Sequence, residues 1–240
     1  MEITNVLMKK FPYIENQEIL EFLYEFNTDG SKINADNSLL SEMEEYAVIN
    51  SIPIVTRDVA NFLKLITAAL NPENILEVGT AIGYSAINMA KSASDEVNID
   101  SIEIDDKIIK RADYYIKKAN LSKNINIICG DGVLEIPKLE KRYDMVFIDA
   151  SKSHYSDFFE KVIYKLNKNY LLIFDNILFR GLICTSFENV PRKHRTIYNN
   201  LKEFLKKLYK NKNYQKAILP IGDGLLVVSG VNDRGTDEKN

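Results

Sequence analysis

The sequence has no tryptophan and only two histidines in 240 residues, and its two cysteines are Cys129 and Cys184. The cysteines lack the CxxC spacing of zinc and redox sites, and no histidine lies close to them in the chain. A structural zinc site and a disulfide-stabilised secreted fold are therefore disfavoured. We expect two buried thiols in a reducing compartment.

Long hydrophobic runs are also missing. No apolar stretch approaches the roughly 20 residues that a membrane-spanning helix needs. The first residues, Met1–Lys10, lack the long apolar core of a signal peptide. We expect a soluble, cytoplasmic protein with no membrane partner.

The chain carries a net charge of −3 and is 45% hydrophobic, which suffices for one sizeable core. The acidic average does not favour a nucleic-acid binder, but the charge is unevenly distributed. Residues 1–50 hold ten acidic and three basic side chains. Residues 191–216 hold one acid, Glu203, and nine bases: Arg192, Lys193, Arg195, Lys202, Lys206, Lys207, Lys210, Lys212 and Lys216.

Three segments follow from these patterns: a helical extension over 1–50, one domain over 51–230, and a polar tail over 231–240. Within the extension, the sequence pattern predicts acidic amphipathic helices over 14–27 and 37–50, with Asn37 or Ser38 capping the second. These helices could cover a site, form the face of a homodimer, or be merely structural.

Apolar strands alternate regularly with amphipathic helices from Ile75 onward, which predicts an α/β fold with a mostly parallel sheet covered on both faces. The run Met145-Val146-Phe147-Ile148 lacks polar alternation, as a strand buried on both faces should. A final β-hairpin around Pro220–Gly224 requires one antiparallel strand. The predicted strands are 75–79, 97–104, 125–129, 143–149, 170–175, 214–219 and 225–229, and the predicted helices are 57–70, 84–92, 106–119, 132–136, 155–166 and 194–210.

The sequence Glu77-Val78-Gly79-Thr80-Ala81-Ile82-Gly83 joins the first of these strands to a helix. Its glycines allow close approach of a ligand to the backbone, and the helix start offers free amides. The dinucleotide-binding motif would need glycine at Ala81. Because Glu77 would repel a phosphate, the turn favours a ligand with an ammonium or sulfonium group.

Polar side chains follow several of the predicted parallel strands and should meet at one edge of the sheet. Glu103 stands where doubly wound folds place a carboxylate on ribose hydroxyls. Asp149, Asp175 and Asn176 offer two carboxylates and an amide oxygen, a set that suits Mg²⁺ rather than zinc. Acidic residues also occur in such loops for turn chemistry alone.

Together, Glu77–Ser85, Glu103, Gly130–Gly132, Phe147–Lys152 and Asp175-Asn176 resemble the cation-dependent class I S-adenosylmethionine O-methyltransferases, over roughly residues 50–230. Within that family, the likeness is greatest to the bacterial tRNA 5-hydroxyuridine methyltransferases. The resemblance implies a Rossmann-like sheet of seven strands with one reversed near its edge. It also implies S-adenosylmethionine and Mg²⁺ as cofactors and tRNA as the partner of a homodimer.

The resemblance also assigns roles residue by residue. The metal ligands that it implies are Asp149, Asp175 and Asn176. Apart from the resemblance, Lys152 lies three residues past Asp149 and either acts as general base or is a solvated lysine at a helix start, so the expected catalytic pair is Lys152 with Asp149. The expected cofactor-binding residues are Val55, Glu77, Gly79, Ser85, Glu103, Asp131, Gly132 and Asp149.

Two alternatives stay open at this stage. The core motifs do not separate a tRNA substrate from a catechol-like small molecule. A cofactor-binding or RNA-binding module without turnover is disfavoured, because the metal-ligand set and Lys152 are both intact. The basic helix over 194–210 could hold an RNA backbone or merely solvate the surface.

Overall fold

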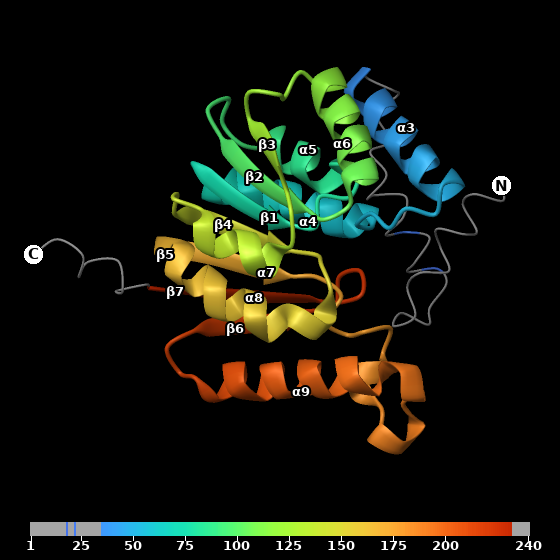
Figure 1. Cartoon of the computed structure of the whole chain (residues 1–240), viewed down its shortest axis with the longest axis vertical. Coiled ribbons are helices and arrows are strands. Elements are labelled where there is room, and N and C mark those ends of the chain that lie inside the picture. Colours follow the sequence, from blue (N-terminus) through green and yellow to red (C-terminus); the bar gives the residue numbers. More distant parts are fainter. Residues whose placement is uncertain (1–17, 19–21, 23–34, 232–240) are drawn as a thin grey trace, which may run out of the picture.

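The computed structural model describes residues 35–231 together with the isolated positions 18 and 22. Seven strands form a single sheet in the order β3-β2-β1-β4-β5-β7-β6 (Figure 1). The strands are β1 (Asn74–Val78), β2 (Asn98–Glu103), β3 (Ile125–Cys129), β4 (Tyr143–Ile148), β5 (Leu166–Phe174), β6 (Gln215–Leu219) and β7 (Leu225–Val231).

The sheet is parallel except for one strand. β7 pairs antiparallel with both β5 and β6, so it alone runs against the other six. This confirms the expected seven-stranded fold with a reversed strand next to the sheet edge.

Helices cover both faces of the sheet. One face carries α3 (Ala35–Ile49), α4 (Arg57–Leu70), α5 (Tyr84–Ala90) and α6 (Asp106–Lys118), and the other carries α7 (Gly132–Glu135), α8 (Tyr155–Val162) and α9 (Arg195–Lys210) (Figure 1). Among the described residues, no helix is both long and apolar enough to cross a membrane.

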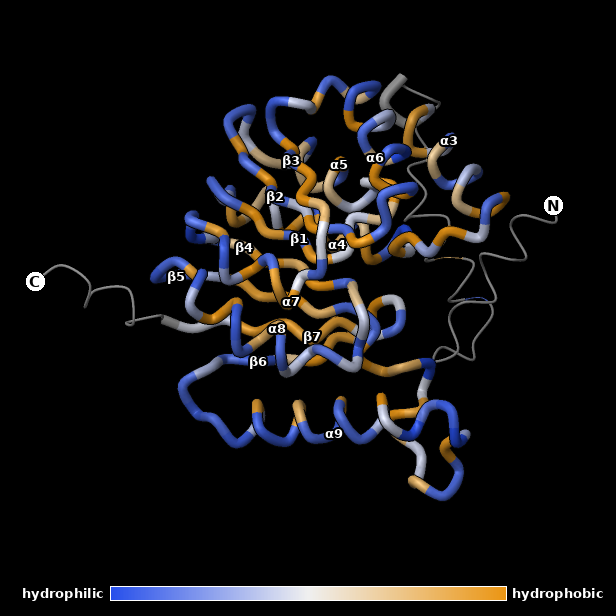
Figure 2. The backbone as a smooth tube through the Cα atoms, viewed as in Figure 1, coloured by the Kyte–Doolittle hydropathy of each residue, from blue (hydrophilic) through white to orange (hydrophobic). Residues whose placement is uncertain are grey.

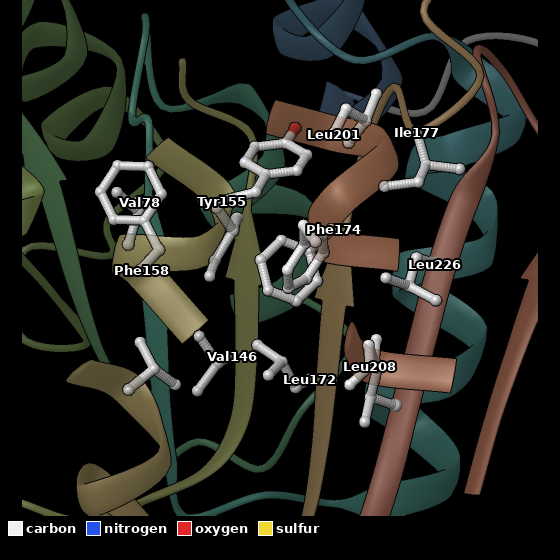
Figure 3. Packing of buried hydrophobic residues seen from close by; sticks show 14 of the residues in the cluster. Val78, Val146, Tyr155, Phe158, Leu172, Phe174, Ile177, Leu201, Leu208 and Leu226 are labelled. Atoms are coloured by element: carbon white, nitrogen blue, oxygen red, sulfur yellow. The ribbon is translucent and has the colours of Figure 1, made fainter. Parts of the chain in front are cut away.

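The core consists of two hydrophobic clusters, one on each side of the sheet. Alternate residues of β4 divide between them: Val146 packs toward α8 and α9, whereas Phe147 packs toward α4 and α5. Val146, Leu172 and Phe174 of the sheet meet Tyr155 of α8 and Leu201 of α9 (Figure 3). The hydrophobic residues of α9 face the sheet and its hydrophilic residues face away (Figure 2). Strand β4 is buried on both faces, as its unbroken apolar run predicts.

Several element boundaries differ from the sequence-based expectation. α8 ends at Val162, and β5 begins four residues earlier than predicted, at Leu166. The polar residues Asn167–Asn169 extend β5 because Asn169 pairs with Val231 of the adjacent strand β7. α3 begins at Ala35, so positions 37 and 38 lie inside the helix rather than at its N-cap.

Three further predictions concern the cysteines and the ends of the chain. Cys129 and Cys184 are both exposed, so the expectation of buried thiols is wrong. Cys129 is the last residue of the outermost strand β3, where its thiol contacts the Asp106 carboxylate rather than the core. The predicted helix over 14–27 lies outside the described residues except at positions 18 and 22, and so does the tail beyond Val231.

Candidate active site at the carboxyl edge of the sheet

The turn after β1 brings the backbone of two strand ends into close contact. Gly79 has a φ of +103°, and a Cβ placed there would lie 2.1 Å from the carbonyl oxygen of Asp149. Only glycine fits this position, because any side chain would collide with the end of β4. The turn that the sequence singled out therefore stands beside Asp149.

Ala81 occupies the position where the dinucleotide-binding motif has glycine. Its φ is +45°, a left-handed conformation that costs a non-glycine residue roughly 1–2 kcal/mol. The Ala81 N–H donates to Glu103 Oε2 at 2.9 Å, which helps to hold the turn in this conformation.

Glu103 is held in place by the backbone. Its Oε2 accepts from Ala81, and its Oε1 accepts from the N–H groups of Ile104 at 2.9 Å and Asp105 at 3.1 Å. These three amides fix the carboxylate at the end of β2, while Oε2, which accepts only one of them, keeps acceptor capacity for a ligand hydroxyl.

Glu77 is fully buried at the end of β1, and its carboxyl accepts from two serine hydroxyls. Ser85 donates to Oε1 at 2.5 Å, and Ser101 donates to Oε2. The pKa of Glu77 is raised to about 7, chiefly by burial; the two serine bonds oppose this shift, and the charges of Asp149 and Glu103 contribute to it. A cation bound nearby would favour the ionised form.

Asp131 and Gly132 lie at the start of α7. The Asp131 carboxylate accepts from the Val133 N–H at 2.8 Å as the helix N-cap, and its side chain is exposed. A Cβ on Gly132 would lie 2.7 Å from Val78 Cγ1. Val55, the remaining residue expected at the cofactor, is buried just before α4. The roles of Asp131 and Val55 in cofactor binding stay predictions.

The proposed metal ligands follow β4 and β5, which are neighbours in the sheet. Asp175 is only 2% exposed, and its carboxylate accepts from the Asn176 N–H at 2.5 Å. Lys152 Nζ donates to Asn176 Oδ1 at 2.9 Å, which brings the expected general base to the expected ligands.

The two carboxyl groups are electrostatically coupled. Burial raises the pKa of Asp149, while the Lys152 ammonium opposes the shift. Burial and then the charge of Asp149 raise the pKa of Asp175 well above its usual range. When both are ionised, the partly buried Asp149 and the buried Asp175 exceed the charge of the one lysine beside them, and a divalent cation would neutralise that excess.

Sequence reasoning missed three residues that support this site. Ser101 lies opposite Glu77 in the β1–β2 register, and Tyr155 donates its hydroxyl to the Asp175 carbonyl at 2.6 Å. Asp223 accepts from the Arg180 N–H, at 2.7 Å from Oδ1 and 3.0 Å from Oδ2. The register and the fold, rather than any motif, bring these residues to the site.

Comparisons with known proteins relate this chain to a protein family. The tapetum-specific methyltransferase 1 of Arabidopsis thaliana is 28% identical over 214 residues, which cover 85% of this chain and 91% of that relative. Caffeoyl-CoA O-methyltransferase 2 of Petunia hybrida is 26% identical over 212 residues, covering 85% of this chain and 88% of the relative.

A solved structure shares the fold. The O-methyltransferase TomG of Streptomyces achromogenes, determined in complex with S-adenosylmethionine, matches with a TM-score of 0.78. The match covers 91% of this chain and 99% of TomG at 18% identity. The family model described as O-methyltransferase matches residues 30–231. The chain therefore belongs to the O-methyltransferase family.

Proposed function

We propose that the protein is a Mg²⁺-dependent methyltransferase that uses S-adenosylmethionine to methylate the 5-hydroxyl of 5-hydroxyuridine in tRNA at the wobble position, giving 5-methoxyuridine. The proposal has three parts, which are the methyl donor, the metal and the acceptor. Each part is supported by different residues.

The cofactor fits the turn after β1. Close backbone approach at Gly79, the amide-held carboxylate of Glu103 and the buried acid Glu77 suit a ligand with a ribose and a cationic group. S-adenosylmethionine has both features, and it supplies an activated methyl group. TomG, which shares the fold, binds this molecule.

The oxygen donors of Asp149, Asp175 and Asn176 suit Mg²⁺. Hard oxygen ligands of this number suit Mg²⁺, with other oxygens completing the octahedron. Among the described residues, no group of three or more His, Cys, Asp and Glu side chains could hold a metal, so the amide of Asn176 is needed to complete the set. When bound, the ion would lower the pKa of the acceptor hydroxyl and fix its position.

Lys152 is the base that we propose removes the acceptor proton. Its Nζ lies 2.9 Å from Asn176 Oδ1, beside the expected metal ligands, and its side chain is half-buried. Methyl transfer is an in-line displacement at carbon, so the protein must mainly align the ionised oxygen with the methyl group. The buried carboxylates and the lysine provide that alignment.

The observation that carries the tRNA assignment is the attachment of a basic helix to the turn that bears Lys152. Asn200 of α9 donates from Nδ2 to the Ser153 carbonyl at 3.2 Å. The outward face of α9 carries Lys206 and Lys210, both exposed. A nucleotide at the site could therefore extend its backbone along α9, where phosphate contacts release counterions.

Not every base in this region is available for RNA. Arg195 donates from Nε to the Val190 carbonyl at 3.1 Å, and its guanidinium lies 4.9 Å from the Phe187 ring centre. Lys207 pairs with Glu203 at 3.5 Å. The candidate RNA contacts are therefore Lys202, Lys206 and Lys210, together with the exposed Arg192 and Lys193 that precede the helix.

Charge reversal of Lys202, Lys206 and Lys210 to Glu tests this surface. We expect weaker tRNA binding, a flatter dependence of affinity on salt and unchanged cofactor affinity. The matched control reverses the charges of Lys110, Lys117 and Lys123, which lie on or beside α6, across the sheet from α9. Both triple variants change the net charge by the same amount. Equal tRNA binding and salt slope in the two triple variants would locate the RNA elsewhere.

A catechol-like small molecule is the second candidate acceptor. The likeness to a caffeoyl-CoA O-methyltransferase favours it, because the same metal and lysine would serve a phenolic hydroxyl. Turnover of a catechol together with none on hydroxyuridine-containing tRNA would decide for this alternative.

A further inference from the structure

The segment that follows the proposed metal ligands has an unusual backbone. Asn176, Phe179 and Arg180 have φ values of +53°, +49° and +54°, and Gly181 follows at +79°. Phe179 and Arg180 adopt this left-handed region at an energetic cost, which is smaller for asparagine, so such a run persists only where the surroundings impose it. One of the strained residues, Asn176, is itself an expected ligand.

The turn between β6 and β7 imposes this conformation. The Ile177 N–H donates to the Gly224 carbonyl, and the Leu178 N–H donates to the Asp223 carbonyl, both at 2.9 Å. The Asp223 side chain then accepts the Arg180 N–H with both oxygens, at 2.7 and 3.0 Å. A hydrogen bond to a carboxylate stabilises the structure more than a bond between two neutral groups.

The turn is itself fixed from the cofactor side of the site. Asp58 of α4 accepts the Gly222 N–H at 2.7 Å. Gly224 has a φ of +84°, and a Cβ there would lie 2.4 Å from Leu178 Cγ, so the turn packs directly on the strained segment. α4 begins two residues after Val55, which is expected to contact the cofactor.

We propose that Asp223 is a positioning residue that holds residues 176–181 in the strained conformation and thereby sets the geometry of the metal ligands Asp175 and Asn176. Asp223 does not itself bind the metal or take part in the chemistry. The inference rests on the proposed function for its link to the metal, but the bracing contacts stand without it. No motif of the metal or cofactor site includes this residue.

The test compares Asp223→Ala with Asp144→Ala. Asp144, near the start of β4, is a matched control because its carboxylate also braces backbone amides, those of Glu73 and Asn74, each at 3.0 Å. It lies at the opposite end of the strand from Asp149. The conservative variant Asp223→Asn keeps one acceptor oxygen for Arg180.

Three quantities are measured on the full chain: hydrogen exchange of the amides at 177–180, affinity for Mn²⁺ alone as a paramagnetic probe, and kcat and KM for methyl transfer. In Asp223→Ala we expect exchange about tenfold faster, Mn²⁺ affinity about tenfold weaker and kcat reduced, with the KM for S-adenosylmethionine little changed. Asp223→Asn should recover part of each loss. Asp144→Ala should match the wild type in all three.

Wild-type exchange and Mn²⁺ affinity in Asp223→Ala would overturn the inference, and so would equal losses in Asp144→Ala. Failure of the proposed function gives a different result. The wild-type protein would then transfer no methyl group to hydroxyuridine-containing tRNA, while the exchange and Mn²⁺ measurements would still decide the role of Asp223.

Discussion

Binding of the cofactor should depend on pH because of Glu77. The carboxyl is buried, and its pKa is raised to about 7. If it must be ionised to face the ammonium group of the ligand, then binding releases the proton that the free protein holds. Affinity should rise with pH, because the free protein loses this proton as the pH passes through about 7.

The pKa sets the size of the effect. At pH 5.5 roughly one Glu77 in thirty is ionised, and at pH 7 about half are, so affinity should increase about fifteenfold between these values. The α-amino group of the ligand stays charged over this range, since such groups titrate near 7.7–8.0. Release at pH 5.5 should approach one proton per ligand.

Calorimetry with S-adenosylhomocysteine, which carries the same ammonium group, measures both quantities. Titrations in two buffers of different ionisation enthalpy give the number of protons released. Glu77→Gln should bind the ligand more weakly and lose the pH dependence, because the amide carries no charge. The hydroxyls of Ser85 and Ser101 can still form hydrogen bonds with the amide, so the local packing is preserved. Wild-type affinity that is equal at pH 5.5 and pH 7, with no proton released, would refute the argument.

The other predictions concern single side chains of the site. Glu103→Ala should weaken cofactor binding about tenfold or more, since a charge-assisted pair of hydrogen bonds is worth roughly 1.5–3 kcal/mol; unchanged affinity by calorimetry in a folded variant would contradict the ribose role. Asp149→Ala and Asp175→Ala should each abolish turnover while leaving the circular dichroism spectrum unchanged, because a weakly held Mg²⁺ cannot spare a ligand. Lys152→Met should slow the chemical step by about 10², the low end for a general base, and a wild-type single-turnover rate would leave the lysine without that role.

Much of the fold could be predicted because its signals are local. The apolar run ending at Ile148 predicts a doubly buried strand, which is confirmed by the burial of β4. The Gly79 turn packs against Asp149 at the end of β4, and the approach of a ligand to this turn stays a prediction. The reversed strand follows from a hairpin at the end of a parallel sheet. These features depend on residue type and on short spacing.

What the sequence did not predict depends on which segments meet in space. Ser101 reaches Glu77 only through the strand register, and Asp223 reaches Arg180 from 43 residues away. The exposure of Cys129 follows from the position of β3 at the sheet edge, which composition alone does not reveal. The homodimer and the tRNA partner stay predictions.

The central claim is Mg²⁺-dependent methyl transfer to a tRNA hydroxyl. The direct measurement is transfer of a labelled methyl group from S-adenosylmethionine to hydroxyuridine-containing tRNA, in Mg²⁺ and in excess EDTA, beside a catechol acceptor. We predict label on tRNA in Mg²⁺ alone and little on the catechol. Undiminished transfer in EDTA would contradict the role of Asp149, Asp175 and Asn176, and label on the catechol alone would contradict the tRNA assignment.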